Sequence, residues 1–352
     1  MNHSIIINSI GTATPGASKI LSDALKVPQD YILKLLYNAP SILFQKVDKN
    51  TALKAEDTLT KLGLDISVYK EDDKFDLTTE LVDISVSFEN VLQLPKVTEQ
   101  LATFLGCKQS EALNLLLNDP SIILGNVSVA TAKALQKRID ANVHYSNPKK
   151  DTYTILINNE IGSSELKNIE NQLKKTIKKE EDIYVIEDVS YNNSQLLWRK
   201  YQSKKTVKLL NQSHQLVHIV MNDFDLDNQE HVSFLVNKVG MPEVILEDLQ
   251  NALPITLFEN INRKNAEEIM GSCLEMGMTV DLKREVNFKK RIQIEAIEDF
   301  EKVTKVLSQF IAKEDLPIEG AKNWESKEAI PSIIARYLLA QLEQLMCNPE
   351  II

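Results

Sequence analysis

The chain has few of the residues from which common catalytic motifs are built: its 352 residues include only 10 glycines and three cysteines. It contains no glycine-rich phosphate loop, no nucleophile elbow and no zinc-protease helix. Cys107, Cys273 and Cys347 are odd in number and far apart, which predicts reduced thiols and not a disulfide framework. No run approaches the ~18 to 20 apolar residues of a membrane span, and the N-terminal segment lacks the pattern of a signal peptide. We therefore expect a cytoplasmic protein without a membrane span.

The charge balance is acidic, with a formal net charge of -10. This argues against a generic nucleic-acid coat, although a local basic face is compatible with it. The apolar and charged fractions are those of ordinary soluble proteins, and the length allows several domains, each with its own core.

A short proline-containing segment occurs three times, at 39–47, 119–127 and 253–261. In each copy a β-branched residue stands seven positions after the proline, and an alanine stands twelve positions after it. The β-branched residues are Val47, Val127 and Ile261, and the alanines are Ala52, Ala132 and Ala266. Gly63 and Gly277 follow in the first and third copies, where they would end a helix with left-handed dihedrals. This register predicts one small unit used three times.

Apolar spacing in the first copy predicts the order β-α-α-β-α-β, with strands at 4–8, 41–47 and 64–68. The second copy has a β-like run at 75–88, and the residues after 287 are expected to be mostly helical, with a final helix at 332–346. We expect an α+β protein made of tandem small units, each with a three-strand sheet and three helices. The expected parts are unit 1 (1–73), unit 2 (74–148), a middle segment (149–213), unit 3 (214–286) and a helical C-terminal segment (287–352). The middle segment is either a degenerate fourth unit or an inserted α/β module.

This element order, with its proline, valine, alanine and glycine register, resembles the C-terminal domain of the bacterial ribosomal stalk protein. Lys96-Val97 and Leu105-Gly106 of unit 2 add to the similarity. The resemblance implies the fold of that domain, which in the family recruits translational GTPases through lysines of its second helix. The positions that match those lysines are Asp30 and Leu33, Ser110 and Leu113, and Val244 and Glu247. Because the lysines are absent from all three copies, the resemblance extends to the fold and not to factor recruitment.

Neither a metal site nor a cofactor site is expected. The run 223–228 begins like a calcium loop, but Asn228 and Phe234 occupy the positions that require glycine and glutamate. A polar turn that caps a helix is the favoured interpretation. The histidines, which we expect at the surface or at strand edges, lack metal-ligand spacing with the cysteines; they are His3, His144, His214, His218 and His231. Cys107 and Cys273 are interpreted as small core residues within helices.

Two segments are candidates for partner contact. The first, the basic segment, combines basic and aromatic side chains at 198–208: Trp198, Arg199, Lys200, Tyr201, Lys204, Lys205 and Lys208. Such a segment can dock on an acidic partner, or it is a solvated helix face whose two aromatic residues pack on the core. The second is the final helix, whose apolar residues include Tyr337 and Leu338 and must be buried on this chain or on a neighbour.

The favoured function is protein–protein interaction, as a non-enzymatic adaptor or structural subunit of a larger assembly. One alternative is a nucleic-acid-associated factor that uses the basic segment, since aromatic and basic residues together stack bases and track phosphates. The other is an enzyme whose site forms between domains and leaves no local motif.

Overall fold

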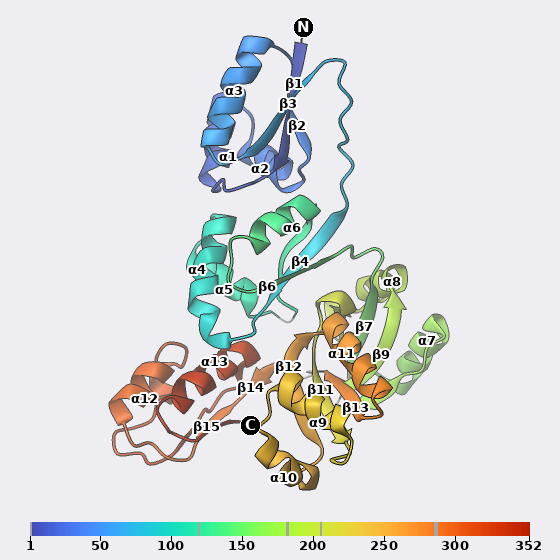
Figure 1. Ribbon diagram of the computed structural model, residues 1–352, viewed down its shortest axis with the longest axis vertical. Helices are drawn as coiled ribbons and strands as arrows, with labels where there is room; N and C mark the ends of the chain where they lie inside the picture. The colour runs from blue at the N-terminus through green and yellow to red at the C-terminus, as the bar shows by residue number, and fades with distance from the viewer. Residues whose placement is uncertain (1, 119, 181–182, 205, 285–287) are drawn as a thin grey trace.

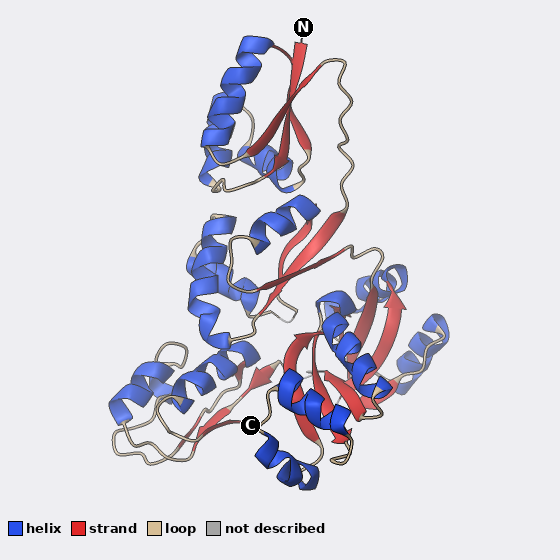
Figure 2. Cartoon of the chain, viewed as in Figure 1, coloured by secondary structure: helices blue, strands red, loops and turns tan. Residues whose placement is uncertain are grey.

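The computed structural model describes residues 2–118, 120–180, 183–204, 206–284 and 288–352. It is an α+β protein built from several small antiparallel sheets with helices packed against them (Figures 1 and 2). Unit 1 lies at the top of Figure 1, unit 2 lies below it, and the middle segment and unit 3 lie side by side at the lower right. Asp119, Asp182, Lys205 and the expected boundary at 286 lie outside the described residues.

Unit 1 has the expected element order. Its elements are β1 (Asn2–Ser9), α1 (Gly16–Leu25), α2 (Gln29–Tyr37), β2 (Ser41–Asp48), α3 (Lys49–Lys61) and β3 (Asp65–Lys70). The sheet order is β2-β1-β3, so the first strand is central. Asp48 caps α3 by accepting hydrogen bonds from the backbone N–H groups of Asn50 and Thr51. Gly63 follows α3 with a φ of 90°, which confirms the left-handed conformation expected there.

Unit 2 repeats this arrangement with one difference from expectation. Its elements are β4 (Leu81–Ser87), α4 (Leu94–Leu105), α5 (Gln109–Leu116), β5 (Ile122–Ser128), α6 (Val129–Gln136) and β6 (Asn142–Ser146), with sheet order β5-β4-β6. The expected strand at 75–88 begins only at Leu81, because the preceding residues form a largely exposed linker without strand pairing. Cys107 lies between α4 and α5, and not inside a helix as expected.

Unit 3 has the same strand order but a less regular first helix. Its elements are β11 (Leu216–Asp223), α9 (Gln229–Ser233), α10 (Leu246–Asn251), β12 (Ile255–Asn262), α11 (Arg263–Glu275) and β13 (Thr279–Arg284), with sheet order β12-β11-β13. A π-helical segment, Phe234–Val239, extends α9. Gly277 has a φ of 91°, as expected for a helix terminator.

The middle segment has the same order of strands and helices as the three units except at one place. Its elements are β7 (Thr152–Asn158), α7 (Ser163–Leu173), β8 (Lys178–Glu180), β9 (Ile183–Ser190), α8 (Tyr191–Tyr201) and β10 (Val207–Asn211). The sheet order is β10-β7-β9-β8, so the first strand again lies between the other two long strands. Strand β8 stands where the units have their second helix.

A residue with positive φ marks the same point in all four parts, near the end of the strand that precedes the last helix. It stands one position before the β-branched residue and two positions before the residue that precedes the next helix. These residues are Lys46 (58°), Asn126 (58°), Asp188 (54°) and Asn260 (54°). The strand register shifts beside each of them, so each sits at a β-bulge. The middle segment therefore has the same local geometry as the units, although it lacks the proline and the alanine of their register.

The C-terminal segment is not mostly helical, and that expectation was wrong. Among the residues that the structure describes in it, only α12 (Phe300–Leu307) and α13 (Ser332–Glu343) are α-helices. Short strands precede, separate and follow these helices: β14 (Lys289–Lys290), β15 (Ile292–Ile294), β16 (Trp324–Glu325), β17 (Ile330–Pro331) and β18 (Pro349–Ile351). The strands pair across long stretches of chain, as β15 does with β18, and such pairing leaves no local periodic signal.

One hydrophobic core runs continuously through unit 1, unit 2 and the C-terminal segment. The middle segment and unit 3 each have a separate core. Among the described residues, no helix combines the length and the hydrophobicity needed to cross a bilayer.

Candidate functional site

A buried histidine lies at the junction of unit 2 with the middle segment and unit 3. The short 3-10 turn Gln212–His214, between β10 and β11, places His214 against strands β4 and β6 of unit 2. Its Nδ1 atom lies 2.6 Å from the hydroxyl of Ser85, and its Nε2 atom lies 2.9 Å from the hydroxyl of Ser146. The expectation of a surface or strand-edge histidine was wrong here, because the side chain becomes enclosed only when the parts pack together. His3 and His231 are buried as well.

The hydrogen bonds around His214 have one consistent direction. Ser146 donates its hydroxyl proton to Asp151 at 2.6 Å, so it accepts a proton from Nε2–H of His214. The Nδ1 atom then accepts from the Ser85 hydroxyl. Asp151 also accepts from Asn211 at 2.7 Å and from Ser213 at 2.9 Å, so its charge is well satisfied.

Burial sets the protonation states at this junction. It lowers the pKa of His214 to about 4, against an opposing effect of Asp151, and it also lowers the pKa of His144. The imidazole of His214 is therefore neutral at pH 7, which fits the directed chain of hydrogen bonds. Burial raises the pKa of the nearby Asp83 carboxyl, whose Oδ1 accepts the backbone N–H of Asn126 at the bulge of unit 2.

The arrangement of these residues fits a structural hydrogen-bond network between parts of the chain and does not fit a hydrolytic triad. A nucleophilic serine needs access to a substrate, but Ser85 is buried. A triad carboxylate orients the histidine, whereas Asp151 here bonds to the second serine. What the network does is satisfy buried polar groups from different parts of the chain at one point.

A second polar junction joins the middle segment to unit 3. Glu187 of β9 accepts hydrogen bonds from Arg263 at 3.2 Å and from Arg284 at 2.9 Å. Arg284 also lies 3.6 Å from Glu180. Both arginines are mostly buried, so the pairs are screened less than surface ion pairs and fix how the two parts face each other.

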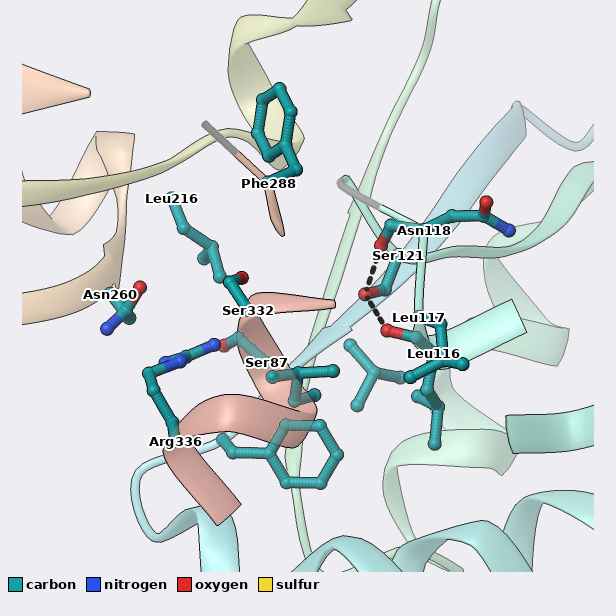
Figure 3. Close-up of a pocket in the computed structure, with 13 residues that line it drawn as sticks. Ser87, Leu116, Leu117, Asn118, Ser121, Leu216, Asn260, Phe288, Ser332 and Arg336 are labelled. Carbon is teal, nitrogen blue, oxygen red and sulfur yellow. Dashed lines mark hydrogen bonds between the residues drawn. The ribbon is translucent and has the colours of Figure 1, made fainter. Parts of the chain in front are cut away.

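A small enclosed space lies where unit 2, unit 3 and the C-terminal segment meet (Figure 3). Its volume is about 30 Å³, which is enough for a water molecule and too small for a substrate. Ser87, Asn260 and Ser332 reach it from the three parts. On one wall, the Ser121 hydroxyl lies within hydrogen-bond distance of the carbonyl oxygens of Leu116 and Asn118, at 2.9 and 2.8 Å.

The basic segment does not form one continuous surface. Trp198, Arg199 and Lys200 are exposed on α8, but Tyr201 is fully buried in the core of the middle segment. Its assignment as a partner contact is therefore wrong; the alternative, an aromatic residue packed on the core, holds for Tyr201. Lys208 lies on β10 with its ammonium 3.3 Å from the ring centroid of Phe288. Lys205 and the side chain of Lys204 lie outside the described part.

The final helix, the second candidate for partner contact, packs on its own chain. Tyr337 and Leu338 of α13 are buried, and the helix packs against α12, β18 and the 3-10 turn Val91–Gln93 of unit 2. Of the two outcomes expected for this apolar helix, burial on the same chain is the one observed.

Leu196 of α8 is not among the contact residues predicted from the sequence, although it is 52% exposed and lies close to Arg199 on the outer face of the helix. Helical periodicity could have identified it, because it falls outside the apolar stripe that Leu197 and Tyr201 form.

The run 223–228, which begins like a calcium loop, forms a helix cap in the structure. Asn228 accepts the backbone N–H of Glu230 at 2.9 Å, and Asp225 accepts that of Asp227. Among the residues that the structure describes, no group of three or more His, Cys, Asp or Glu side chains is arranged to hold a metal ion.

Comparison of the chain with models of known protein families, with curated proteins and with solved structures finds no match in any of the three.

Proposed function

We propose that this chain is a non-enzymatic subunit of a larger assembly and that it acts through protein–protein contact. The observation that carries the proposal is the outer face of α8. Leu196 is 52% exposed there, with Arg199 and Lys200 exposed beside it, whereas Trp198, 39% exposed, lies toward the other side of the helix. Arginine is one of the residues that most often dominate the energy of protein interfaces.

The internal junctions support this proposal because they make the surface rigid before a partner arrives. The inner face of α8 is anchored by the buried side chains of Ser194, Leu197 and Tyr201. The middle segment is in turn held by the His214 network and by the Glu187 ion pairs. A preorganised surface loses less conformational entropy on binding.

Charge indicates the kind of partner. The basic side chains on α8 stand out in a chain whose formal net charge is -10. They suit an acidic face, on another protein or on a second copy of this chain, and would speed association and orient it.

The test compares two double variants of the full chain in its source cell, with chemical cross-linking and identification of the recovered proteins. Leu196→Ala/Arg199→Glu should lose the partner. The control Leu53→Ala/Lys54→Glu changes an equally exposed pair on α3 and should keep it. Recovery of the same partners with both variants would contradict the proposal, as would a catalytic turnover by the purified parent.

The salt dependence of binding distinguishes the nucleic-acid alternative from protein–protein contact. Binding to RNA or DNA that weakens steeply as salt rises, and that Arg199→Glu abolishes, would favour that alternative.

A further inference from the structure

A cleft of about 420 Å³ lies between unit 1 and unit 2. Unit 1 contributes the end of β1 and the turn after it, with Ser9, Thr12 and Asp65. Unit 2 contributes α6 and the residues just after it, with Lys133, Lys137 and Arg138. The volume is within the range of sites for small molecules, which often lie between domains.

The charges in this cleft are unbalanced. Three cations face one carboxylate, and Asp65 already accepts hydrogen bonds from Asn8 at 3.3 Å and from Ser9 at 3.4 Å. Lys133 and Lys137 stand one helical turn apart and are exposed. Among the described residues, no carboxylate lies within 4.0 Å of either ammonium group.

Arg138 is the most unusual of the three cations, because it is half-buried and no described carboxylate lies within ion-pair distance. One of its terminal nitrogens donates to the carbonyl oxygen of Ala13 at 2.9 Å, across the boundary between the units. The guanidinium also lies 5.2 Å from the ring centroid of Phe104. These contacts hold the planar group in place. A guanidinium has five N–H donors in all, and the hydrogen bond to Ala13 uses one of them.

Arg138 also borders a second cleft of about 350 Å³, which it shares with Thr12 and Phe104. The guanidinium of Arg138 thus borders two clefts at the same boundary. Burial lowers the pKa of Arg138, which means that its charged form is penalised by its surroundings. An anion in the cleft would offset that penalty.

We propose that this cleft binds a small phosphorylated molecule through its phosphate group, with Lys133, Lys137 and Arg138 as the cationic contacts. A fixed guanidinium suits the geometry of phosphate oxygens, and two flexible lysines add charge. The hydroxyls of Ser9 and Thr12 line the opposite wall, where they donate to Asp65 and to the carbonyl oxygen of Gly63, both at 3.4 Å. This inference does not depend on the function proposed for α8.

The test is calorimetric titration of the full chain at constant ionic strength, with inorganic phosphate in one arm and a phosphate monoester, glucose 6-phosphate, in the other. Saturable binding of either probe is expected. Tighter binding of the monoester would identify an organic phosphate as the ligand, and equal or tighter binding of inorganic phosphate would identify the free ion.

The variant Lys133→Gln/Lys137→Gln removes two exposed charges without touching the core and should weaken binding about tenfold or more. The control Lys34→Gln/Lys54→Gln removes two exposed lysines of α2 and α3 outside the cleft and should bind as the parent does. No saturable binding of either probe would overturn the inference. So would equal affinity of the parent and the cleft variant.

Discussion

Gly106 of unit 2 packs directly against Pro15 of unit 1. A Cβ atom at position 106 would lie 2.3 Å from the Cβ of Pro15, a separation that no real pair of such atoms tolerates. Gly106 also ends α4 with a φ of 70°, and its N–H donates to the carbonyl of Ala102 at 2.8 Å. One glycine therefore serves both the end of a helix and the contact between two units.

Replacing Gly106 by alanine should destabilise the protein by more than the cost of its backbone conformation. That conformation alone costs a residue with a Cβ about 1 to 2 kcal/mol. The matched control is Gly240→Ala, because Gly240 has a φ of 85° and no atom within 4 Å of the added Cβ. Urea unfolding should show a clearly larger loss for Gly106→Ala, and proteolysis of the 71–80 linker should be faster. Equal losses for the two variants would show that the Pro15 contact is unimportant.

Gly63 and Gly277 provide a second matched pair, because they end corresponding helices with nearly equal φ values. A Cβ at position 63 would lie 2.7 Å from the backbone nitrogen of Ala13, whereas a Cβ at position 277 would meet nothing within 4 Å. Gly277→Ala should cost about 1 kcal/mol, from conformation alone, and Gly63→Ala should cost more. Thermal unfolding of both variants measures the difference. A Gly277 variant as stable as the parent would disprove the conformational argument.

The His214 junction should make stability depend on pH. In the unfolded chain this histidine takes up a proton near its ordinary pKa of 6.5, but in the folded chain only near 4. Between these values the unfolded state binds more protons, so the free energy of unfolding falls as pH decreases from 6.5 to about 4. The full difference corresponds to about 3 kcal/mol.

His214→Gln isolates this contribution, because glutamine can form hydrogen bonds but does not titrate. The variant should be less stable at pH 7 and should lose part of the decline between pH 6.5 and about 4. Denaturant unfolding at several pH values checks this. Parallel stability curves for the parent and the variant would rule out His214 as the source.

The burial of α13 predicts how the stability of the C-terminal segment responds when individual side chains are shortened. Leu338→Ala should cost about 2 to 5 kcal/mol, since the side chain is fully buried. Ile318→Ala, at a residue that is 80% exposed, should change stability by less than about 0.5 kcal/mol. Calorimetric unfolding distinguishes them; a small effect at Leu338 would mean that α13 does not anchor this segment. Deletion of 332–352 should therefore disrupt the segment and is not a clean test of partner binding.

The order of strands and helices in units 1 to 3 follows from local patterns. The apolar run of β1, the prolines before β2 and β12, and the terminal glycines Gly63 and Gly277 act on the backbone within a few residues. Such signals are legible in a sequence because they do not depend on distant contacts. The shared origin of the units, and their resemblance to the ribosomal stalk domain, stay predictions.

The middle segment shows where local patterns end. It lacks the proline and the alanine of the register, yet Asp188 lies at a bulge that corresponds to the one at Lys46 in unit 1. The pairing of β7 with β9, which lie far apart in sequence, creates this similarity. Only the folded chain shows it, because a bulge is a property of two strands together.

Exposure was likewise decided by tertiary structure. The sequence left open whether Tyr201 meets a partner or packs on the core and whether Leu338 is buried on this chain or on a neighbour, and it predicted His214 at the surface or at a strand edge. All three are buried, because other parts of the chain cover them: the sheet of the middle segment, the strands of unit 2, and the remainder of the C-terminal segment. Local spacing determines which face of an element is apolar, but what covers that face depends on contacts between residues remote in sequence.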